Sequence, residues 1–201
     1  MATDPSPLLP GYLSQFKAAD AQGTVLDLAC GSGRNGLYLL ENGIRVVFAD
    51  NDAAALAQVQ STLRTQRYRD REHLATSWTV DFEQCQANPF DNRRFAAIIV
   101  YRYLHRPLFE HIRQAVKPGG LVIYETFTVD QPKFGRPRNP DFLLEHGELP
   151  GYFSGWSLLH SFEGVVTAGP DDTPQAVAQV VARRPSSKPI VGPTGSPGCA
   201  I

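Results

Sequence analysis

Short apolar runs alternate with segments whose apolar residues recur at helical spacing, and this order predicts strands separated by helices. The apolar runs predict strands over residues 24–28, 45–50, 76–80, 95–100 and 121–127. Helical spacing predicts helices over residues 34–41, 52–67 and 108–116, and one more short helix before the first strand. Strands alternating with helices predict a doubly wound α/β domain, whose ligands bind near the carboxyl ends of the strands.

The pattern is less regular in the C-terminal third. Residues 128–142 are rich in proline and arginine and are predicted to form a loop, followed by one or two short helices up to residue 153. Alternating segments over residues 156–163 and 177–184 predict a closing pair of strands. Proline, glycine and serine dominate from residue 185, so a disordered tail is expected. The sequence thus predicts a lead-in over residues 1–23, one domain over 24–184 and a tail over 185–201.

The stretch from Thr24 to Gly36 joins a strand, a glycine turn and a helix start. Gly31, Gly33 and Gly36 match the spacing of a dinucleotide fingerprint, which alone is weak evidence. Asp27 lies inside the strand, where a carboxylate is awkward next to a pyrophosphate but suits a ligand with an amino group and a sulfonium. The alternative is a purely structural turn, which would leave this acid in the strand without a partner.

Polar residues fall at the carboxyl ends of four successive predicted strands. They are Asp27, Asp50, Asp81 and Tyr101. A carboxylate can accept two hydroxyl hydrogen bonds, so Asp50 suits a ribose diol. Asp81 and the adjacent Phe82 suit an adenine, with the acid accepting from the amino group and the ring packing on the base. Each acid alone can equally be a helix cap or a turn residue, but their occurrence at successive strand ends favours one nucleoside site.

The composition of the chain argues against several classes of binding partner. The 201-residue chain has a formal net charge of −1, so no overall basic footprint indicates nucleic acid or an anionic membrane. Cys30, Cys85 and Cys199 are far apart and odd in number, which argues against a disulfide framework or a zinc site. Neither a signal peptide nor an apolar run of membrane-spanning length is visible, and a cytoplasmic location is expected.

Several motifs resemble those of the class I S-adenosylmethionine-dependent methyltransferases, over residues 24 to about 184. These motifs span residues 26–33, 48–50, 80–82, 95–100 and 117–125, and include the Lys-Pro-Gly-Gly turn at 117–120 that dinucleotide dehydrogenases rarely show. Within that class, Gly33-Arg-Asn and the segment from Tyr103 to Pro107 resemble the tellurite-resistance-type methyltransferases. The sequence departs from the common pattern at Cys30, Ala49 and Arg102.

The resemblance implies a Rossmann-like, seven-stranded sheet that is mostly parallel with the last strand antiparallel. It also implies S-adenosyl-L-methionine as cofactor and S-adenosyl-L-homocysteine as product. The cofactor-binding residues implied are Asp27, Ala29, Gly31, Gly33, Arg34, Asn35, Asp50, Asn51, Asp81, Phe82 and Tyr101. Among them Asp27 and the glycines would hold the methionine portion, Asp50 the ribose, and Asp81 with Phe82 the adenine.

The methyl acceptor is less defined. The candidate catalytic residues are Tyr101, Arg102, His105, Arg106, Glu125 and Arg138, and Arg136 lies in the same loop as Arg138. Clustered arginine and histidine favour an anion, so a metalloid oxyanion, a thiol or a small acid is expected as the acceptor. A structural alternative remains, in which Arg106 and Pro107 begin a helix and residues 136–140 form an ordinary loop.

Three other functions stay open. A nucleic-acid or protein methyltransferase is the first, although the residues after the fourth strand lack the Asn/Asp-Pro-Pro-aromatic tetrad of amino-directed enzymes, and Asn139-Pro-Asp-Phe142 imitates it only in a loop. The second is an NAD-binding oxidoreductase, which Asp27 argues against. The third is a module that holds the nucleoside without catalysis. The expected partner is a small molecule, with no nucleic acid, membrane or metal, and the chain is expected to be a monomer or a homodimer.

Overall fold

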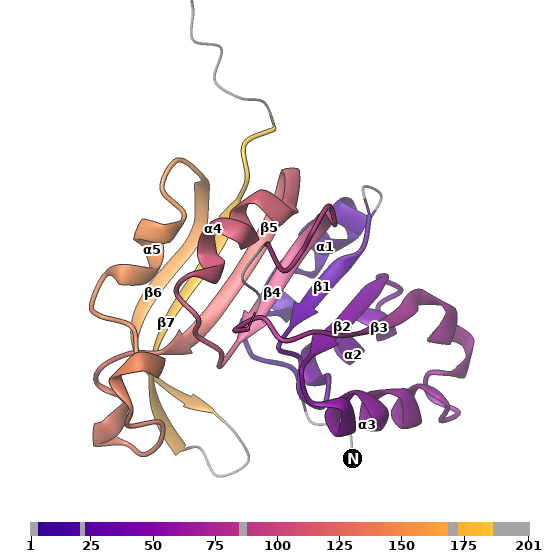
Figure 1. Ribbon diagram of the computed structural model, residues 1–201, viewed down its shortest axis with the longest axis horizontal. Coiled ribbons are helices and arrows are strands. Elements are labelled where there is room, and N and C mark those ends of the chain that lie inside the picture. Colours follow the sequence, from indigo (N-terminus) through magenta and orange to yellow (C-terminus); the bar gives the residue numbers. More distant parts are fainter. Residues whose placement is uncertain (1–3, 21–22, 85–87, 169–172, 187–201) are drawn as a thin grey trace, which may run out of the picture.

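A seven-stranded sheet runs through the computed structural model, which describes residues 4–20, 23–84, 88–168 and 173–186 (Figure 1). The strand order is β3-β2-β1-β4-β5-β7-β6. The strands are β1 (Val25–Leu28), β2 (Val46–Asp50), β3 (Ala75–Thr79), β4 (Phe95–Tyr101), β5 (Val116–Phe127), β6 (Ser157–Ala168) and β7 (Thr173–Arg183). Strands β1 to β5 pair in parallel, whereas β7 is antiparallel to both β5 and β6. The predicted sheet, with its last strand antiparallel, is confirmed.

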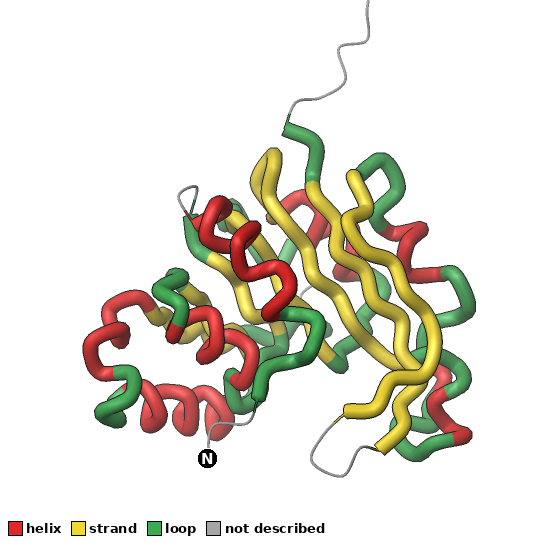
Figure 2. Tube along the Cα trace, turned by 180° about the vertical axis from the view of Figure 1, so that it is seen from behind, coloured by secondary structure: helices red, strands yellow, loops and turns green. Residues whose placement is uncertain are grey.

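Helices lie on both faces of this sheet. They are α1 (Leu13–Asp20), α2 (Arg34–Glu41), α3 (Ala53–Leu63), α4 (Leu108–Ala115) and α5 (Glu148–Tyr152), with 3-10 turns η1 (Pro10–Tyr12), η2 (Arg69–Leu74), η3 (Gln131–Lys133) and η4 (Pro140–Phe142). One core packs α1, α2 and α3 on the sheet, and the other packs α4 and α5. From behind, α1 lies over the sheet beside β5, while β7 and β6 carry no described helix on that face (Figure 2).

Local signals set the ends of the helices next to the site. Gly33, at φ +77°, precedes α2, and Gly43, at φ +81°, follows it. A left-handed residue at a helix end is inexpensive for glycine, so the predicted span of 34–41 is confirmed. Asp52 caps α3 as predicted, because its side chain accepts hydrogen bonds from Ala54 N and Ala55 N.

Several predicted boundaries are wrong. Helix α3 ends at Leu63 rather than at residue 67, and η2 follows it with the Tyr68 ring buried in the core beside α2. Strand β5 begins at Val116 rather than at Leu121, so the Lys-Pro-Gly-Gly segment lies inside the strand. Gly119, at φ +78°, and a register shift opposite Phe95 absorb the turn within the strand.

Parts of the sequence predictions fall outside the described residues. These are Cys85, Cys199, the turn at 169–172 and the tail from residue 187. In the segments that the structure describes, no helix has both the length and the apolar character needed to cross a membrane.

Candidate functional site

The glycine turn between β1 and α2 has an unusual backbone. Ala29, Gly31 and Gly33 all have positive φ, at 52°, 52° and 77°. A Cβ added at Gly33 would come within 2.8 Å of Val59 Cγ2, so this glycine is needed for packing against α3. A Cβ added at Gly31 would meet nothing within 4 Å, so the backbone there faces open space that a ligand can enter.

Asp27 lies buried beneath this turn. Its Oδ2 accepts a hydrogen bond of 2.8 Å from Gly36 N at the start of α2. Burial raises the pKa of the carboxyl to about 7, the neighbouring Asp50 adds to the shift, and Gly36 N and Arg34 only partly offset it. The carboxylate therefore lacks a close cation, and a ligand ammonium would supply one.

Asp50, at the end of β2, is joined to the same turn. Its Oδ2 accepts from Gly31 N at 2.8 Å, and its Oδ1 accepts from Asp52 N at 2.9 Å. Each carboxylate oxygen can accept a second hydrogen bond, so both remain able to bind hydroxyl groups. Asn51 follows directly and is exposed.

Asp81 and Phe82 lie one step further along the sheet edge. Asp81 Oδ1 accepts hydrogen bonds from Glu83 N at 2.9 Å and Gln84 N at 3.3 Å, so the side chain stabilises its own turn. The Phe82 ring is buried with its centroid 5.7 Å from that of Trp78 and 5.6 Å from that of Phe90. The ring therefore belongs to the core and offers a ligand little surface.

Tyr101, at the end of β4, meets the N-terminal segment. Its buried hydroxyl lies beside that of Ser6, and apart from each other the two oxygens have no hydrogen-bond partner in the described chain. Burial raises the pKa of Tyr101 well above its usual value, so the phenol stays protonated. Ser6 N donates to Asn35 Oδ1 at 2.8 Å, which holds the segment against α2. The sequence carried no signal for Ser6, because it comes from a proline-rich lead-in far from the site along the chain.

Arg102, just after β4, begins a row of polar side chains that continues through β5 and β7 to β6. It has φ +59°, its Nη2 lies 3.1 Å from Glu125 Oε1, and its Cζ lies 4.6 Å from the centroid of Phe127. Glu125 is buried and accepts from Gln179 Nε2 at 2.6 Å, and Gln179 Oε1 lies 3.0 Å from His160 Nε2. Burial lowers the pKa of Arg102, although Glu125 opposes this shift. The two predicted residues thus form an ion pair, and sequence alone did not find Gln179 and His160.

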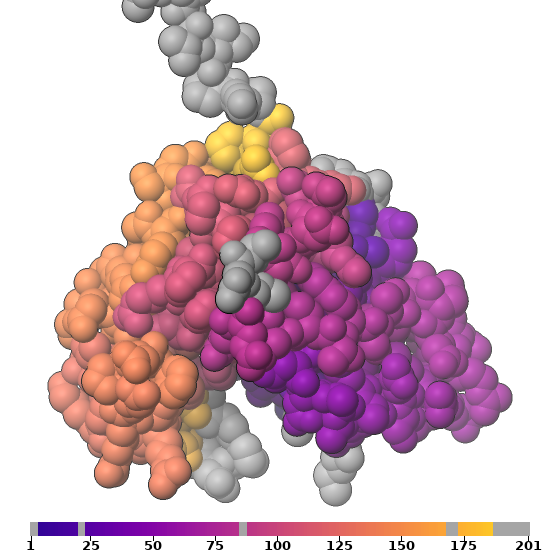
Figure 3. All heavy atoms as spheres, viewed as in Figure 1, coloured from indigo at the N-terminus to yellow at the C-terminus, as the bar shows by residue number. Residues whose placement is uncertain are grey.

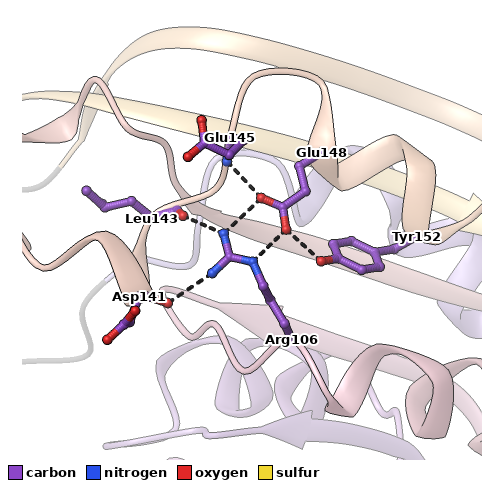
Figure 4. A network of polar contacts seen from close by, with 6 residues as sticks. All are labelled: Arg106, Asp141, Leu143, Glu145, Glu148 and Tyr152. Atoms are coloured by element: carbon purple, nitrogen blue, oxygen red, sulfur yellow. Dashed lines mark hydrogen bonds and ion pairs between the residues drawn. The ribbon is translucent and has the colours of Figure 1, made fainter.

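Arg106 has its hydrogen-bonding groups occupied by protein (Figure 4). Its Nε and Nη2 bind Glu148 Oε1 and Oε2 at 2.7 and 2.9 Å, Nη2 also donates to Leu143 O at 2.8 Å, and Nη1 to Asp141 O at 3.3 Å. Tyr152 donates its hydroxyl to Glu148 Oε1 at 2.6 Å. The residue predicted to orient an acceptor instead fastens residues 141–152 to the segment that follows β4.

His105 lines a cavity of about 300 Å³ together with Glu83, Arg106, Asp141 and Phe142. Arg136 and Arg138 are exposed and line a second cavity of about 550 Å³. A larger cavity, of about 660 Å³, lies between α2 and α3 and is lined in part by Ser32 and Arg34 of the glycine turn.

The predicted residues therefore separate into two groups along the carboxyl edge of the sheet. One group surrounds the glycine turn and the end of β4, and the other lies on the segment after β4 and the loop at 136–142. In the space-filling view, the molecule is hollowed along its lower edge between the indigo and the orange parts of the chain (Figure 3). Strands β1 and β4 run toward this edge in Figure 1. Across the described ranges, no three His, Cys, Asp or Glu side chains are grouped to hold a metal ion.

Comparisons with known proteins bear on the family and the fold. The family described as "Methyltransferase domain" matches residues 25–120. The chain is 28% identical over 148 residues to the protein named "Probable S-adenosyl-L-methionine-dependent methyltransferase TehB" from Haemophilus influenzae, and the match covers 70% of this chain. The chain spans about half the length of that relative, 48%.

Solved structures share the fold. The crystal structure of TehB from Haemophilus influenzae superimposes with a TM-score of 0.64 at 21% identity, covering 87% of this chain and 62% of the other. The glycopeptide N-methyltransferase MtfA in complex with S-adenosyl-L-homocysteine gives a TM-score of 0.63 at 16% identity, covering 91% of each chain. At these identities the likeness establishes the fold alone.

Proposed function

The chain belongs to the class I S-adenosylmethionine-dependent methyltransferases, and on that premise we propose that it transfers the methyl group of S-adenosyl-L-methionine to a small acceptor. S-adenosyl-L-homocysteine is the expected second product. The expected acceptors are a thiol, a small acid or a metalloid oxyanion.

The single observation that carries this proposal is the buried carboxylate of Asp27 beneath an open glycine turn. Burial raises its pKa to about 7, and the one short hydrogen bond, from Gly36 N, only partly offsets this shift. The α-ammonium of the cofactor is a suitable cation, and the open space beside Gly31 suits the methionine chain. A dinucleotide would instead bring a pyrophosphate toward this acid.

The neighbouring groups suit the rest of the cofactor. Asp50 would bind the ribose hydroxyls with its remaining lone pairs, and Asp81 would accept from the adenine amino group. Arg34 and Asn35 lie at the start of α2, where backbone N–H groups and the helix dipole favour the cofactor carboxylate. Ala29 and Asn51 would contact the cofactor through the backbone of the two turns that they occupy. The buried hydroxyls of Ser6 and Tyr101 supply further donors at the same edge.

When bound, the cofactor supplies an activated methyl group on a sulfonium. The nucleophilic atom of the acceptor would bond to the methyl carbon in line, as the carbon–sulfur bond breaks and S-adenosyl-L-homocysteine leaves as a neutral thioether. The main contribution of the protein is then alignment and exclusion of water. An acceptor that is protonated at neutral pH also needs a group that takes its proton, and His105, which lines the cavity after β4, would serve as that base. Arg102, paired with Glu125, would orient an acceptor oxygen at the end of β4.

Two measurements test the proposal. Calorimetry should show micromolar binding of S-adenosyl-L-homocysteine and no comparable binding of NADH, and tight binding of NADH alone would refute the cofactor assignment. A screen with methyl-labelled cofactor against selenite, thiols and small carboxylic acids should then show transfer to one class. Cofactor binding without transfer to any acceptor would favour a nucleoside-binding module.

A further inference from the structure

Two cavities on the acceptor side meet at one aromatic side chain. Phe142 lines both the cavity beside His105, of about 300 Å³, and the cavity beside Arg138, of about 550 Å³. Its side chain is 48% exposed, which is high for a phenylalanine. Small-molecule sites occupy roughly 300–1,000 Å³ and are usually apolar with a few polar groups, so the two cavities together have a suitable size.

The outer cavity is basic. Arg136 and Arg138 line it, and neither side chain has a hydrogen bond or an ion pair with any residue of the described chain. Asn139 lies between these arginines and Phe142, and its side chain accepts from Asp141 N at 3.1 Å, which holds the loop in shape. Two free guanidinium groups on one wall match a carboxylate or another anionic group.

The inner cavity has the opposite character. Glu83 and Asp141 line it together with His105. Arg106 also reaches it, but its charge is compensated by Glu148 at 2.7 Å. A bare inorganic oxyanion placed there would face two carboxylates with no free cation, and like charges at short range disfavour that ligand.

We propose that the acceptor is an organic anion, with its anionic group on Arg136 and Arg138 and an apolar or aromatic body on Phe142. Its other end then lies in the inner cavity beside His105, where the proposed methyl transfer would occur. This proposal rests on the proposed function and narrows its acceptor: a small acid with an apolar body fits both cavities, whereas a bare metalloid oxyanion matches the arginines of the outer cavity but is disfavoured by the carboxylates of the inner one. Glu83 lies two residues after Asp81, so the inner cavity borders the candidate adenine site.

The test uses a probe ligand that carries the proposed anionic group and aromatic body. 3-Phenylpropionate carries an aryl group and a carboxylate, 3-phenylpropionamide is its neutral counterpart, and selenite is a bare oxyanion. Each is titrated into the full chain with and without S-adenosyl-L-homocysteine, and backbone amide shifts are followed by NMR. The expected result is saturable shifts at residues 136–142 and 104–106 with 3-phenylpropionate, about tenfold weaker binding of the amide, and no shifts at residues 104–106 with selenite.

Variants test whether binding depends on Arg136 and Arg138 in particular or on the overall charge of the protein. The double variant Arg136→Gln/Arg138→Gln should weaken 3-phenylpropionate binding about tenfold, and Phe142→Ala should weaken it severalfold. Arg64→Gln removes an exposed arginine outside both cavities and should leave binding unchanged. Equal binding of the amide, shifts outside the two cavities, stronger binding of selenite or an unaffected double variant would each overturn the proposal.

The two proposals fail separately. If S-adenosyl-L-homocysteine does not bind, the proposed function is wrong, while the titration without it still tests the cavities. If it binds and 3-phenylpropionate does not, the inference about the acceptor is wrong and the methyltransferase proposal stands.

Discussion

Replacing Arg106 by alanine should destabilise the fold by releasing residues 141–152 from the end of β4. The guanidinium makes two charged hydrogen bonds to Glu148, at 2.7 and 2.9 Å, and donates to the carbonyl oxygens of Leu143 and Asp141. Glu148 also accepts from Glu145 N at 2.8 Å, so its carboxylate connects the loop, α5 and the segment after β4. Loss of the arginine leaves this carboxylate without its cation.

The expected loss of stability depends on how far the ion pair of Arg106 and Glu148 is exposed to solvent. Exposed ion pairs contribute about 0.2–1 kcal/mol, and removing one partner of a buried pair costs about 3–5 kcal/mol. The Arg106 side chain is 36% exposed and that of Glu148 is 17% exposed, so the pair lies between these limits. We expect a coupling free energy of about 1.5 kcal/mol, and a loss of about 2.5 kcal/mol for Arg106→Ala because two carbonyl oxygens also lose a donor. For a domain of this size the melting temperature should fall by about 5–10 °C.

The assay is urea unfolding of the wild type, Arg106→Ala, Glu148→Ala and the double variant, which gives the coupling free energy directly. The pair of Lys133 and Asp130, with side chains 71% and 37% exposed, is a matched control whose coupling should stay below about 0.5 kcal/mol. If the coupling between Arg106 and Glu148 is no larger than that of the control, the reasoning is refuted.

The ion pair of Arg106 and Glu148 should also make stability depend on pH. Burial alone would raise the pKa of Glu148, but hydrogen bonds from Arg106 and Tyr152 hold it below its usual value. Its stabilising contribution is therefore present above the usual pKa of a glutamate and is lost as the pH falls through the lowered pKa. The stability difference between the wild type and Glu148→Ala should shrink over that acidic range.

Three further predictions concern the cofactor side. The pKa of Asp27 is about 7 in the folded protein, whereas the ordinary value is 3.8. Between these two pH values only the folded state keeps the carboxyl protonated, so the free energy of unfolding should fall by at most about 4 kcal/mol as the pH rises through that window. Asp27→Asn should flatten this dependence in unfolding measurements, and wild-type affinity for S-adenosyl-L-homocysteine should rise toward pH 7. Asp50→Ala should abolish measurable binding in calorimetry with the circular dichroism spectrum retained; unchanged affinity would exclude the ribose role. Gly36→Ala would place a Cβ 2.4 Å from Phe48 Cε1 and should lower stability by about 1–3 kcal/mol in urea unfolding.

Much of the fold was predictable because burial and pattern agree in the parallel strands. Every residue of β4 is buried, so its apolar run was an unambiguous signal. Strand β6 is different: it extends to Ala168 although the pattern ended it at residue 163. Leu158 and Val165 on this edge strand are 45% and 52% exposed, so hydrophobicity there does not report burial and cannot mark the end of the strand.

The site was predictable where its contacts are local. Asp27 and Asp50 bind backbone N–H groups of one turn, and the glycine spacing announces that turn in the sequence. The partner of Arg106 lies 42 residues away, and Gln179 lies 54 residues from Glu125, so no spacing rule connects either pair. Phe82 shows the reverse error, because an aromatic residue after an acid fits an adenine pocket by pattern but packs into the core in three dimensions.

The two halves of the site are built by different means, and this has a consequence for specificity. The proposed cofactor side is formed by the glycine turn and strand ends, whose geometry is fixed by backbone hydrogen bonds within the sheet. The proposed acceptor side depends on a loop that Arg106 fastens at residues 141–148, while Arg136 and Arg138 lie on the part of the loop that precedes this fastening. Substitutions at Arg136, Arg138 and Phe142 are therefore expected to change the acceptor preference while cofactor affinity is retained, since Arg106 holds the loop through the backbone carbonyl oxygens of Asp141 and Leu143.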